Sequence, residues 1–366
     1  MKKLFVDLAE KSYNIYFDVD FSKLCDKIGK IGNYKKVLIV TDSNVSVLYA
    51  KEVYRLFCDS GYDTKITQFE AGEQSKHIDT IMSICGACIE HGMDRKSLIV
   101  ALGGGVVGDM AGFAASIYMR GIDFVQIPTT LLSQSDSSVG GKTGIDFMNA
   151  KNILGAFHQP KLVYINTSTL KTLPKREFIS GMGEVIKHSM IRDRGFFDRL
   201  VKNHDSIAEL DNNVLLDIAY ANCSIKADVV SKDEFENSLR ADLNFGHTIG
   251  HAIEAYSDFR LSHGECVGLG MLAVSYISNK RGIFSENELK ELENALGLYG
   301  FSLKTELVDK KVVKDIMQKD KKKSSGILKF VLPEKIGSVF QCTDVTDKEI
   351  DSALDFINMC VAGRKL

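Results

Sequence analysis

The stretch that decides the fold is LIVALGGGVVGD, residues 98–109, where an apolar run passes directly into a glycine-rich turn. Five consecutive apolar residues, 98–102, are typical of a buried β-strand, and the pattern after the turn predicts a helix. The turn has the spacing GxGxxG at Gly103, Gly105 and Gly108. Such glycines let backbone N–H groups approach a pyrophosphate at a helix N-terminus, although a tight turn packed only for structural reasons would also carry them.

Short apolar runs alternate with amphipathic helical patterns on both sides of this stretch. The alternation predicts βαβ units and a mostly parallel sheet, the doubly wound α/β class. Strands are expected at residues 37–41, 64–69, 98–102, 124–127 and 162–165, and helices at residues 45–57, at 75–91 and after the glycine-rich turn. We therefore expect a Rossmann-like nucleotide-binding domain over residues 1–172.

The pattern becomes almost entirely helical after Pro174. We expect residues 173–366 to form a second, mainly α-helical domain. Its expected elements are helices at residues 178–191, 196–201, 214–230, 245–256, 267–278 and 286–298, a hairpin at 328–332 and 338–341, and a final helix.

The charge balance argues against two classes of partner. The 366 residues include 46 Lys+Arg and 48 Asp+Glu, a net charge of −2, so no chain-wide basic field exists to hold nucleic acid or an anionic membrane. The most apolar stretch, 98–119, contains Asp109 and five glycines and is not expected to span a membrane. We expect neither nucleic acid nor a membrane as a partner.

The eight cysteines are scattered, and charged residues interrupt the N-terminus before an apolar signal segment can form. We therefore expect reduced thiols and a cytoplasmic location. The pair Cys85 and Cys88 forms a CxxC, but no second pair exists. Both are expected to be small core residues on an apolar helical stripe with Ile78, Ile81, Met82 and Ile89.

A long polar loop, residues 128–144, follows the strand at 124–127. Its GKT at 141–143 imitates the end of a P-loop, but the required earlier glycine is Asp136, so it is not a Walker A motif. Because so long and polar a loop is costly without a ligand, we expect it to contact one.

Histidines indicate a metal site. His247 and His251 are four residues apart on a predicted helix, so both project from one face, and His263 follows closely. Glu184 and Lys187 are three residues apart on an otherwise apolar helix. A carboxylate and several imidazoles on apolar helices suggest a divalent metal with an open coordination position. Spacing alone leaves the ligand set open and favours the pair His247 and His251.

Further polar residues suggest how ligands are held. Asp42, at the end of a strand, is a candidate for a ribose hydroxyl, and Asp123 is an alternative. Cations flanking the predicted loops and helices indicate a substrate with more than one anionic group. These cations are Arg120, Lys142, Lys151, Lys187, Lys226, Arg240 and the run at residues 321–323.

Several motifs together resemble the 3-dehydroquinate synthase family. The resemblance runs in order from about Asp42 to Gly337. The motifs are RGI at 120–122, FVQIPTTLL at 124–132, DSSVGGKTG at 136–144, KN at 151–152, GEVIKH at 183–188, LNFGHTIGHAIE at 243–254 and HGE at 263–265.

The resemblance implies a Rossmann-like domain, a helical domain and an active site in the cleft between them. It also implies bound NAD and a catalytic divalent metal, usually zinc, with cobalt as an alternative. The metal ligands carry over onto Glu184, His247 and His263, with His251 facing substrate instead. The NAD contacts carry over onto Asp42, Gly72, Glu73, Lys76, Gly105, Val106, Val107, Gly108, Asp109, Thr129, Thr130, Lys142, Lys151, Thr169, Leu170, Lys171 and Thr172.

The implied substrate is a small sugar acid phosphate, 3-deoxy-D-arabino-heptulosonate 7-phosphate, and the implied assembly is a homodimer. Arg240 with Lys226 would hold the carboxylate, and Asp136 and Lys187 would lie at the hydroxyls near the metal. Arg120 would reach the phosphate from the partner subunit. The remaining phosphate contacts would be Lys142, Asn152, Asn244, His251 and a lysine of the tail run, for which Lys322 is our choice.

Two related activities are alternatives. A sugar phosphate cyclase acting on a phosphate without a carboxylate would not need Arg240 and Lys226. A metal-dependent polyol dehydrogenase would need neither the glycine–lysine loop nor so many cations. A third alternative is a nucleotide-binding regulatory or scaffold protein without catalytic activity. The intact candidate metal ligands Glu184, His247 and His263 argue against it.

Three residues depart from the family pattern. An extra Lys323 adds to the lysine pair of the tail, and Cys266 stands where a small residue is common and is expected to pack rather than ligate. Asp242 replaces a more usual apolar residue, and the sequence offers no account of it.

Overall fold

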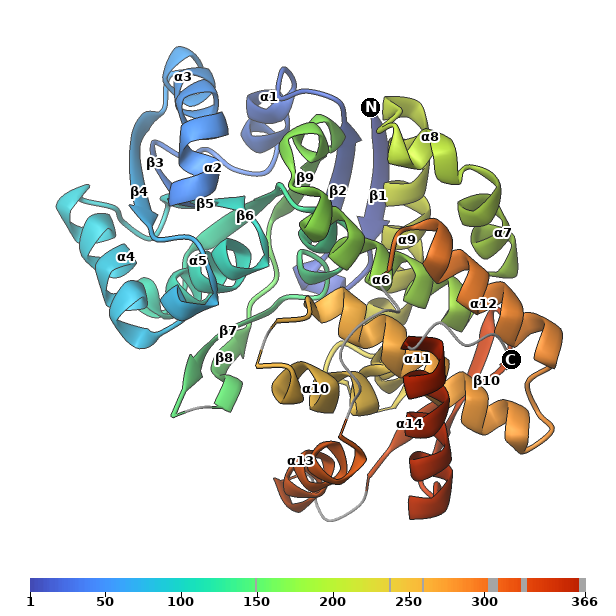
Figure 1. Ribbon diagram of the computed structural model, residues 1–366. Coiled ribbons are helices and arrows are strands. Elements are labelled where there is room, and N and C mark those ends of the chain that lie inside the picture. Colours follow the sequence, from blue (N-terminus) through green and yellow to red (C-terminus); the bar gives the residue numbers. More distant parts are fainter. Residues whose placement is uncertain (149, 237, 259, 302–308, 324–327, 362–366) are drawn as a thin grey trace. The chain divides into compact units, whose positions relative to one another are not determined.

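The computed structural model describes residues 1–366 except 149, 237, 259, 302–308, 324–327 and 362–366, and does not describe the side chains of residues 319–323, 360 and 361 (Figure 1). The chain forms two compact units. The first comprises Met1–Leu173 and Leu215–Ser231, and the second Pro174–Val214 and Lys232–Leu366.

A seven-stranded sheet forms the centre of the first unit, in the order β1-β2-β9-β6-β5-β3-β4. Only the β1–β2 pair is antiparallel, which confirms the expected mostly parallel sheet. Its strands are β1 (Lys2–Val6), β2 (Tyr13–Asp18), β3 (Lys36–Asp42), β4 (Asp63–Phe69), β5 (Leu98–Gly103), β6 (Asp123–Pro128) and β9 (Leu162–Asn166).

Helices cover both faces of this sheet (Figure 1). Alternate residues of β3 show the two faces, because Val37 and Ile39 pack with α1 and α3, whereas Leu38 and Val40 pack with α4 and α5. The helices of these two layers are α1 (Leu24–Gly29), α2 (Ser43–Val45), a π-helical turn η2 (Ser46–Ala50), α3 (Lys51–Asp59), α4 (Ile78–Glu90) and α5 (Gly105–Ile117).

Part of α9 (Asn212–Lys232) belongs to the first unit, whereas we expected everything after residue 172 to belong to the second. The reason is apolar packing. Ala219, Cys223 and Ala227 of α9 share a buried cluster with Ile15 and Phe17 of β2. Helical periodicity shows that α9 has an apolar face but does not show which core that face covers.

Two features of the first unit were not expected. The antiparallel hairpin of β7 (Lys142–Phe147) and β8 (Ala150–Phe157) includes the end of the polar loop. The proposed apolar stripe of α4 was wrong at Ile78, Met82 and Ile89, which are 38%, 61% and 68% exposed. Ile81 and Cys88 of the predicted stripe are buried as expected, together with Thr80 and Ile84.

The second unit is mainly helical, as expected. It also contains the antiparallel hairpin of β10 (Phe330–Lys335) and β11 (Ser338–Cys342). The other elements are α6 (Lys175–Arg192), α7 (Arg194–Lys202), α8 (His204–Ala208), the 3₁₀ helix η7 (Leu239–Asn244), α10 (His247–Tyr256), α11 (His263–Lys280), α12 (Glu286–Leu298), α13 (Lys310–Lys323) and α14 (Asp347–Val361).

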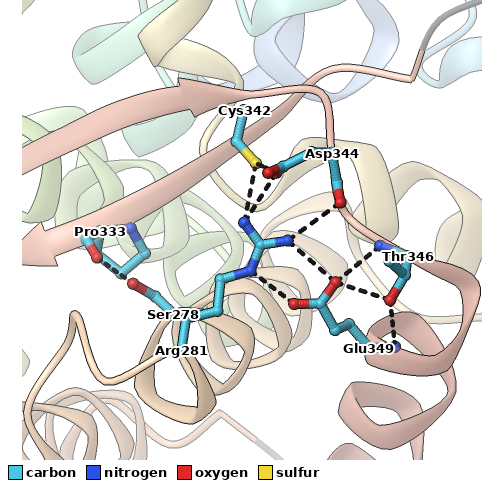
Figure 2. A network of polar contacts seen from close by, with 7 residues as sticks. All are labelled: Ser278, Arg281, Pro333, Cys342, Asp344, Thr346 and Glu349. Carbon is cyan, nitrogen blue, oxygen red and sulfur yellow. Dashed lines mark hydrogen bonds and ion pairs between the residues drawn. The ribbon is translucent and has the colours of Figure 1, made fainter.

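A polar network around Arg281 fastens the end of α11 to the start of α14 (Figure 2). The Arg281 Nε and Nη2 donate to the two Glu349 carboxylate oxygens at 2.6 and 3.0 Å, and Nη1 donates to Asp344 at 2.9 Å. The hydrogen bonds that Glu349 accepts, first from Arg281 and then from Thr346, lower its pKa to about 2. The network therefore stabilises the second unit through charge at neutral pH.

Among the described residues, no helix combines the length and apolar character needed to cross a bilayer.

Candidate active site

Glycines allow α6, α10 and α11 to touch backbone to backbone. A Cβ atom on Gly183 would lie 2.7 Å from the Gly264 carbonyl oxygen, and one on Gly264 would overlap the Ser180 carbonyl oxygen. Similarly, a Cβ atom on Gly270 of α11 would overlap the carbonyl oxygen of Gly246, which has φ +79° and precedes α10. The predicted metal ligands adjoin these glycines in the sequence: Glu184 follows Gly183, His247 follows Gly246, and His263 precedes Gly264.

The three ligands implied by the resemblance, Glu184, His247 and His263, lie together. Glu184 Oε1 is 3.5 Å from His247 Nε2 and 3.4 Å from His263 Nε2. Two ligand atoms of a tetrahedral zinc ion, each about 2.1 Å from the metal, would lie about 3.4 Å apart. This donor set of one carboxylate and two imidazoles therefore fits a divalent metal ion.

Second contacts orient both imidazoles. His247 Nδ1 lies 3.2 Å from the Phe245 carbonyl oxygen, which can only accept, so Nδ1 carries the proton and Nε2 faces Glu184. His263 Nδ1 lies 3.2 Å from the Glu254 carboxylate. Carboxylates and carbonyls in this position fix the tautomer of metal-binding histidines. Sequence reasoning did not assign a role to Glu254.

The two imidazoles differ in basicity. Burial, followed by the charge of Lys187, lowers the pKa of His247 well below its usual value. Burial would also lower the pKa of His263, but hydrogen bonds to Glu184 and Glu254 outweigh it and raise the pKa to about 9. Glu184 is 1% exposed and also pairs with Lys187. A cation among these groups would replace the proton that His263 otherwise holds.

His251 offers a second possible ligand set. Ligand atoms of His247, His251 and His263 all lie within 4.8 Å of one another. The pair favoured by sequence spacing is therefore geometrically possible, but His251 is an exposed residue, whereas Glu184 is buried. We retain Glu184, His247 and His263 as the proposed ligands.

The glycine-rich turn forms the expected junction in the first unit. β5 ends at Gly103, and Gly104 is the N-cap of α5. A Cβ atom on Gly108 would lie 2.7 Å from the Gln126 side-chain oxygen, so this glycine permits close packing of helix on sheet. The turn thus leaves the N-terminus of α5 suited to an anionic ligand.

A buried lysine stands beside this helix. Lys76 is 5% exposed, and its Nζ donates to Asp109 Oδ2 at 2.6 Å. Burial would lower the pKa of Lys76, but Asp109 and Glu73 outweigh it and raise the pKa. Burial raises the pKa of Asp109. Glu73, Lys76 and Asp109, three of the predicted NAD contacts, therefore lie together.

Of the two ribose candidates, the structure favours Asp42. Asp42 lies at the carboxyl end of β3, where its Oδ1 accepts from the N–H groups of Asn44 and Val45 at 2.9 Å. Asp123 begins β6 and accepts from the Tyr34 hydroxyl at 2.9 Å. Ligands of parallel α/β sheets bind at the carboxyl ends of the strands, so the alternative Asp123 lies at the wrong end.

Part of α9 holds the polar loop in place. Lys226 Nζ donates to both the carbonyl and the carboxylate of Asp136, at 2.7 and 2.6 Å. The Asn222 amide donates to the Ser135 carbonyl at 2.6 Å. Within the loop, the fully buried Gln134 side chain donates to the Thr169 hydroxyl at 3.0 Å. Sequence reasoning missed Gln134 and Asn222, because no local motif marks them.

The other predicted residues have varied settings. Thr129 is buried and its N–H donates to the Gly103 carbonyl at 2.9 Å. Arg240 is 2% exposed, and its guanidinium donates to the Glu234 carbonyl at 2.5 Å. Lys322 lies in α13, but its side chain is outside the described residues. The exposed predicted residues are Gly72, Glu73, Arg120, Lys142, Lys151, Asn152, Lys171, Thr172, Asn244 and His251.

Two family models match consecutive parts of the chain, 3-dehydroquinate synthase N-terminal over residues 66–180 and 3-dehydroquinate synthase C-terminal over residues 181–323. The chain belongs to the 3-dehydroquinate synthase family. A 3-dehydroquinate synthase of Ruminiclostridium cellulolyticum is 47% identical over 345 residues, covering 94% of this chain and 96% of that protein. One from Acetivibrio thermocellus is 47% identical over 351 residues, covering 96% and 97%.

Solved structures of sugar phosphate cyclases share the fold. The 2-epi-5-epi-valiolone synthase ValA of Streptomyces hygroscopicus, with NAD+ and Zn2+ bound, has a TM-score of 0.88 at 27% identity and covers 98% of this chain and 99% of that chain. A 2-deoxy-scyllo-inosose synthase with carbaglucose-6-phosphate, NAD+ and Co2+ has a TM-score of 0.87 at 24% identity, with the same coverage. These matches confirm the expected Rossmann-like and helical domains.

The contact between Glu254 and His263 leads to a prediction. Glu254→Ala should weaken zinc binding by about 10–100-fold, because His263 loses the group that orients its ring, and Glu254→Gln should weaken it less. Competition of the apo-protein with a chromophoric chelator measures the affinity. Glu286→Gln, which removes an exposed carboxylate of α12 that pairs with Lys290, is the control. Equal zinc affinity of Glu254→Ala and wild type would contradict the prediction.

Proposed function

We propose that the protein converts 3-deoxy-D-arabino-heptulosonate 7-phosphate to 3-dehydroquinate and phosphate. The observation that carries this proposal is the 47% identity to 3-dehydroquinate synthases over nearly the full length of both chains. The arrangement of Glu184, His247 and His263 supports it, because a family member without a metal donor set would not perform this chemistry.

We propose NAD and a divalent metal, zinc or cobalt, as the cofactors. When bound, NAD supplies a reversible hydride acceptor for C5 of the substrate, and the metal supplies a Lewis acid for the neighbouring oxygens. Glu184, His247 and His263 would hold the metal. The glycine-rich turn, Lys76 with Asp109, and Asp42 would hold the nucleotide, and the close packing at Gly108 supports this assignment.

The anionic ends of the substrate would be bound by cations of the chain. Arg240 and Lys226 would hold the carboxylate, and Lys142, Asn152, Asn244, His251 and Lys322 the phosphate. The burial of Arg240 and Lys226, 2% and 6% exposed, supports this role, because a desolvated cation binds an anion more strongly than a solvated one. Asp136 and Lys187 would contact the hydroxyls near the metal.

The net reaction would be that of a carbon–oxygen lyase. Transient oxidation at C5, which bound NAD would supply, would acidify the adjacent C–H bond and allow phosphate to leave by elimination. Re-reduction, ring opening and an intramolecular aldol closure would follow, with no net consumption of NAD. The relatives at 47% identity favour this reaction over that of a cyclase lacking the carboxylate, although such cyclases are among the structural neighbours.

We also propose a homodimer and a cytoplasmic location. Ile117 and Met119, 44% and 43% exposed, closely precede the exposed Arg120 in the sequence and support a protein contact there. The seven described cysteines are all free thiols, as a reducing compartment would keep them. Light scattering should give the mass of two chains, and a monomer at micromolar concentration would contradict the dimer.

The function is tested by following phosphate and NADH together. With the heptulosonate phosphate, NAD and zinc, phosphate should appear in proportion to substrate without net NADH, because the hydride returns within each turnover. A chelator should abolish the release, and zinc should restore it.

Other outcomes would point to the alternatives. Net NADH from a simple polyol would make the protein a dehydrogenase. Reaction with sedoheptulose 7-phosphate, but not with the acid, would contradict the carboxylate role of Arg240 and Lys226.

A further inference from the structure

Asp242 is a buried carboxylate with two donors from different elements. It lies in η7 and is 5% exposed. Its Oδ2 accepts from Arg192 Nη2 at 2.8 Å, and its Oδ1 accepts from the Gln341 side-chain amide at 2.9 Å. Both oxygens are therefore engaged in defined directions, which an apolar side chain of similar size could not reproduce.

The two donors belong to elements that matter for the site. Arg192 is the last residue of α6, the helix that carries Glu184 and Lys187. Gln341 belongs to β11, and its amide also donates to the Ser238 carbonyl at 2.8 Å, just before η7 begins. Asp242 thus fastens η7 to the end of α6 and, through Gln341, to the hairpin.

η7 depends on such side-chain contacts because it is a short 3₁₀ helix of six residues. Its N-terminal side is held by Asp233, whose Oδ2 accepts from the N–H groups of Ser238 and Arg240 at 2.8 and 3.0 Å. Asp242 lies two residues from Arg240 and two from Asn244, both assigned to substrate binding above. A rotation of η7 would therefore displace both residues together.

We propose that Asp242 is a positioning residue for the anionic substrate: its contacts with Arg192 and Gln341 fix η7 and hold Arg240 and Asn244 in the orientation that binds substrate. This inference rests on the proposed function. It explains the buried charge, because a role in packing alone would not need an ion pair, and replacing such a pair by apolar groups is often neutral for stability.

The test is a set of variants of the full chain assayed with the heptulosonate phosphate. Asp242→Leu should raise KM about tenfold with a smaller change in kcat, because Arg240 would bind the substrate carboxylate, away from C5 and from the leaving phosphate. Asp242→Asn keeps one acceptor and should have an intermediate KM. Zinc affinity, measured by chelator competition, should remain that of wild type.

Two further variants separate positioning from stability. The double variant Arg192→Met/Asp242→Leu removes both charges and should recover the Tm lost in Asp242→Leu, while its KM stays high. Arg281→Met, which breaks the ion pairs of Figure 2 with Asp344 and Glu349, should lower the Tm and leave KM unchanged.

Several outcomes would overturn the proposal. One is a KM of Asp242→Leu within about twofold of the wild-type value. Another is a wild-type KM in the double variant, because the role of Asp242 would then be only to neutralise Arg192. If Arg281→Met raised KM as much as Asp242→Leu does, the KM increase would reflect general destabilisation and not the position of η7. A wild-type protein without turnover would overturn the proposed function itself, and the inference with it.

Discussion

The proposed metal donor set depends on the contact of three helix backbones at glycine residues. Gly183 faces Gly264, and Gly246 faces Gly270, so α6, α10 and α11 approach more closely than side chains would allow. Glu184, His247 and His263 are the immediate sequence neighbours of three of these glycines. A side chain at any of them would separate the helices and move a ligand by more than coordination tolerates.

The same packing explains the electrostatics of the second unit. A carboxylate that is 1% exposed is costly to bury unless positive charge lies beside it. Lys187 on the same helix and His263 on α11, whose pKa is raised, supply that charge to Glu184. Glu254 and the Phe245 carbonyl then orient the imidazoles. The fold therefore places and orients these side chains through contacts within the second unit.

The sequence predicted what local patterns encode and missed what depends on distant contacts. The strand at 98–102, the glycine-rich turn and the helix at 286–298 follow from periodicity and appear as expected. Ile78, Met82 and Ile89 of α4 were predicted to be buried, because a helix with apolar residues on more than one face does not reveal which face meets the sheet. The apolar face of α9 could equally have covered either core.

The candidate site divides in the same way. Helical spacing favoured His247 with His251, because residues four apart share a face, but it could not bring in Glu184 from a helix more than sixty residues earlier in the sequence. The resemblance implies Glu184 as a ligand, and its distances of 3.5 and 3.4 Å to His247 Nε2 and His263 Nε2 support this assignment. The sequence alone could not explain Asp242, because its partners Arg192 and Gln341 are 50 and 99 residues away.

X-ray absorption spectroscopy at the zinc edge of the zinc-loaded protein tests the proposed ligand set most directly. The account predicts two imidazoles and oxygen ligands, from His247, His263 and Glu184. Three imidazoles, which would include His251, or a sulfur ligand from Cys266, would contradict it.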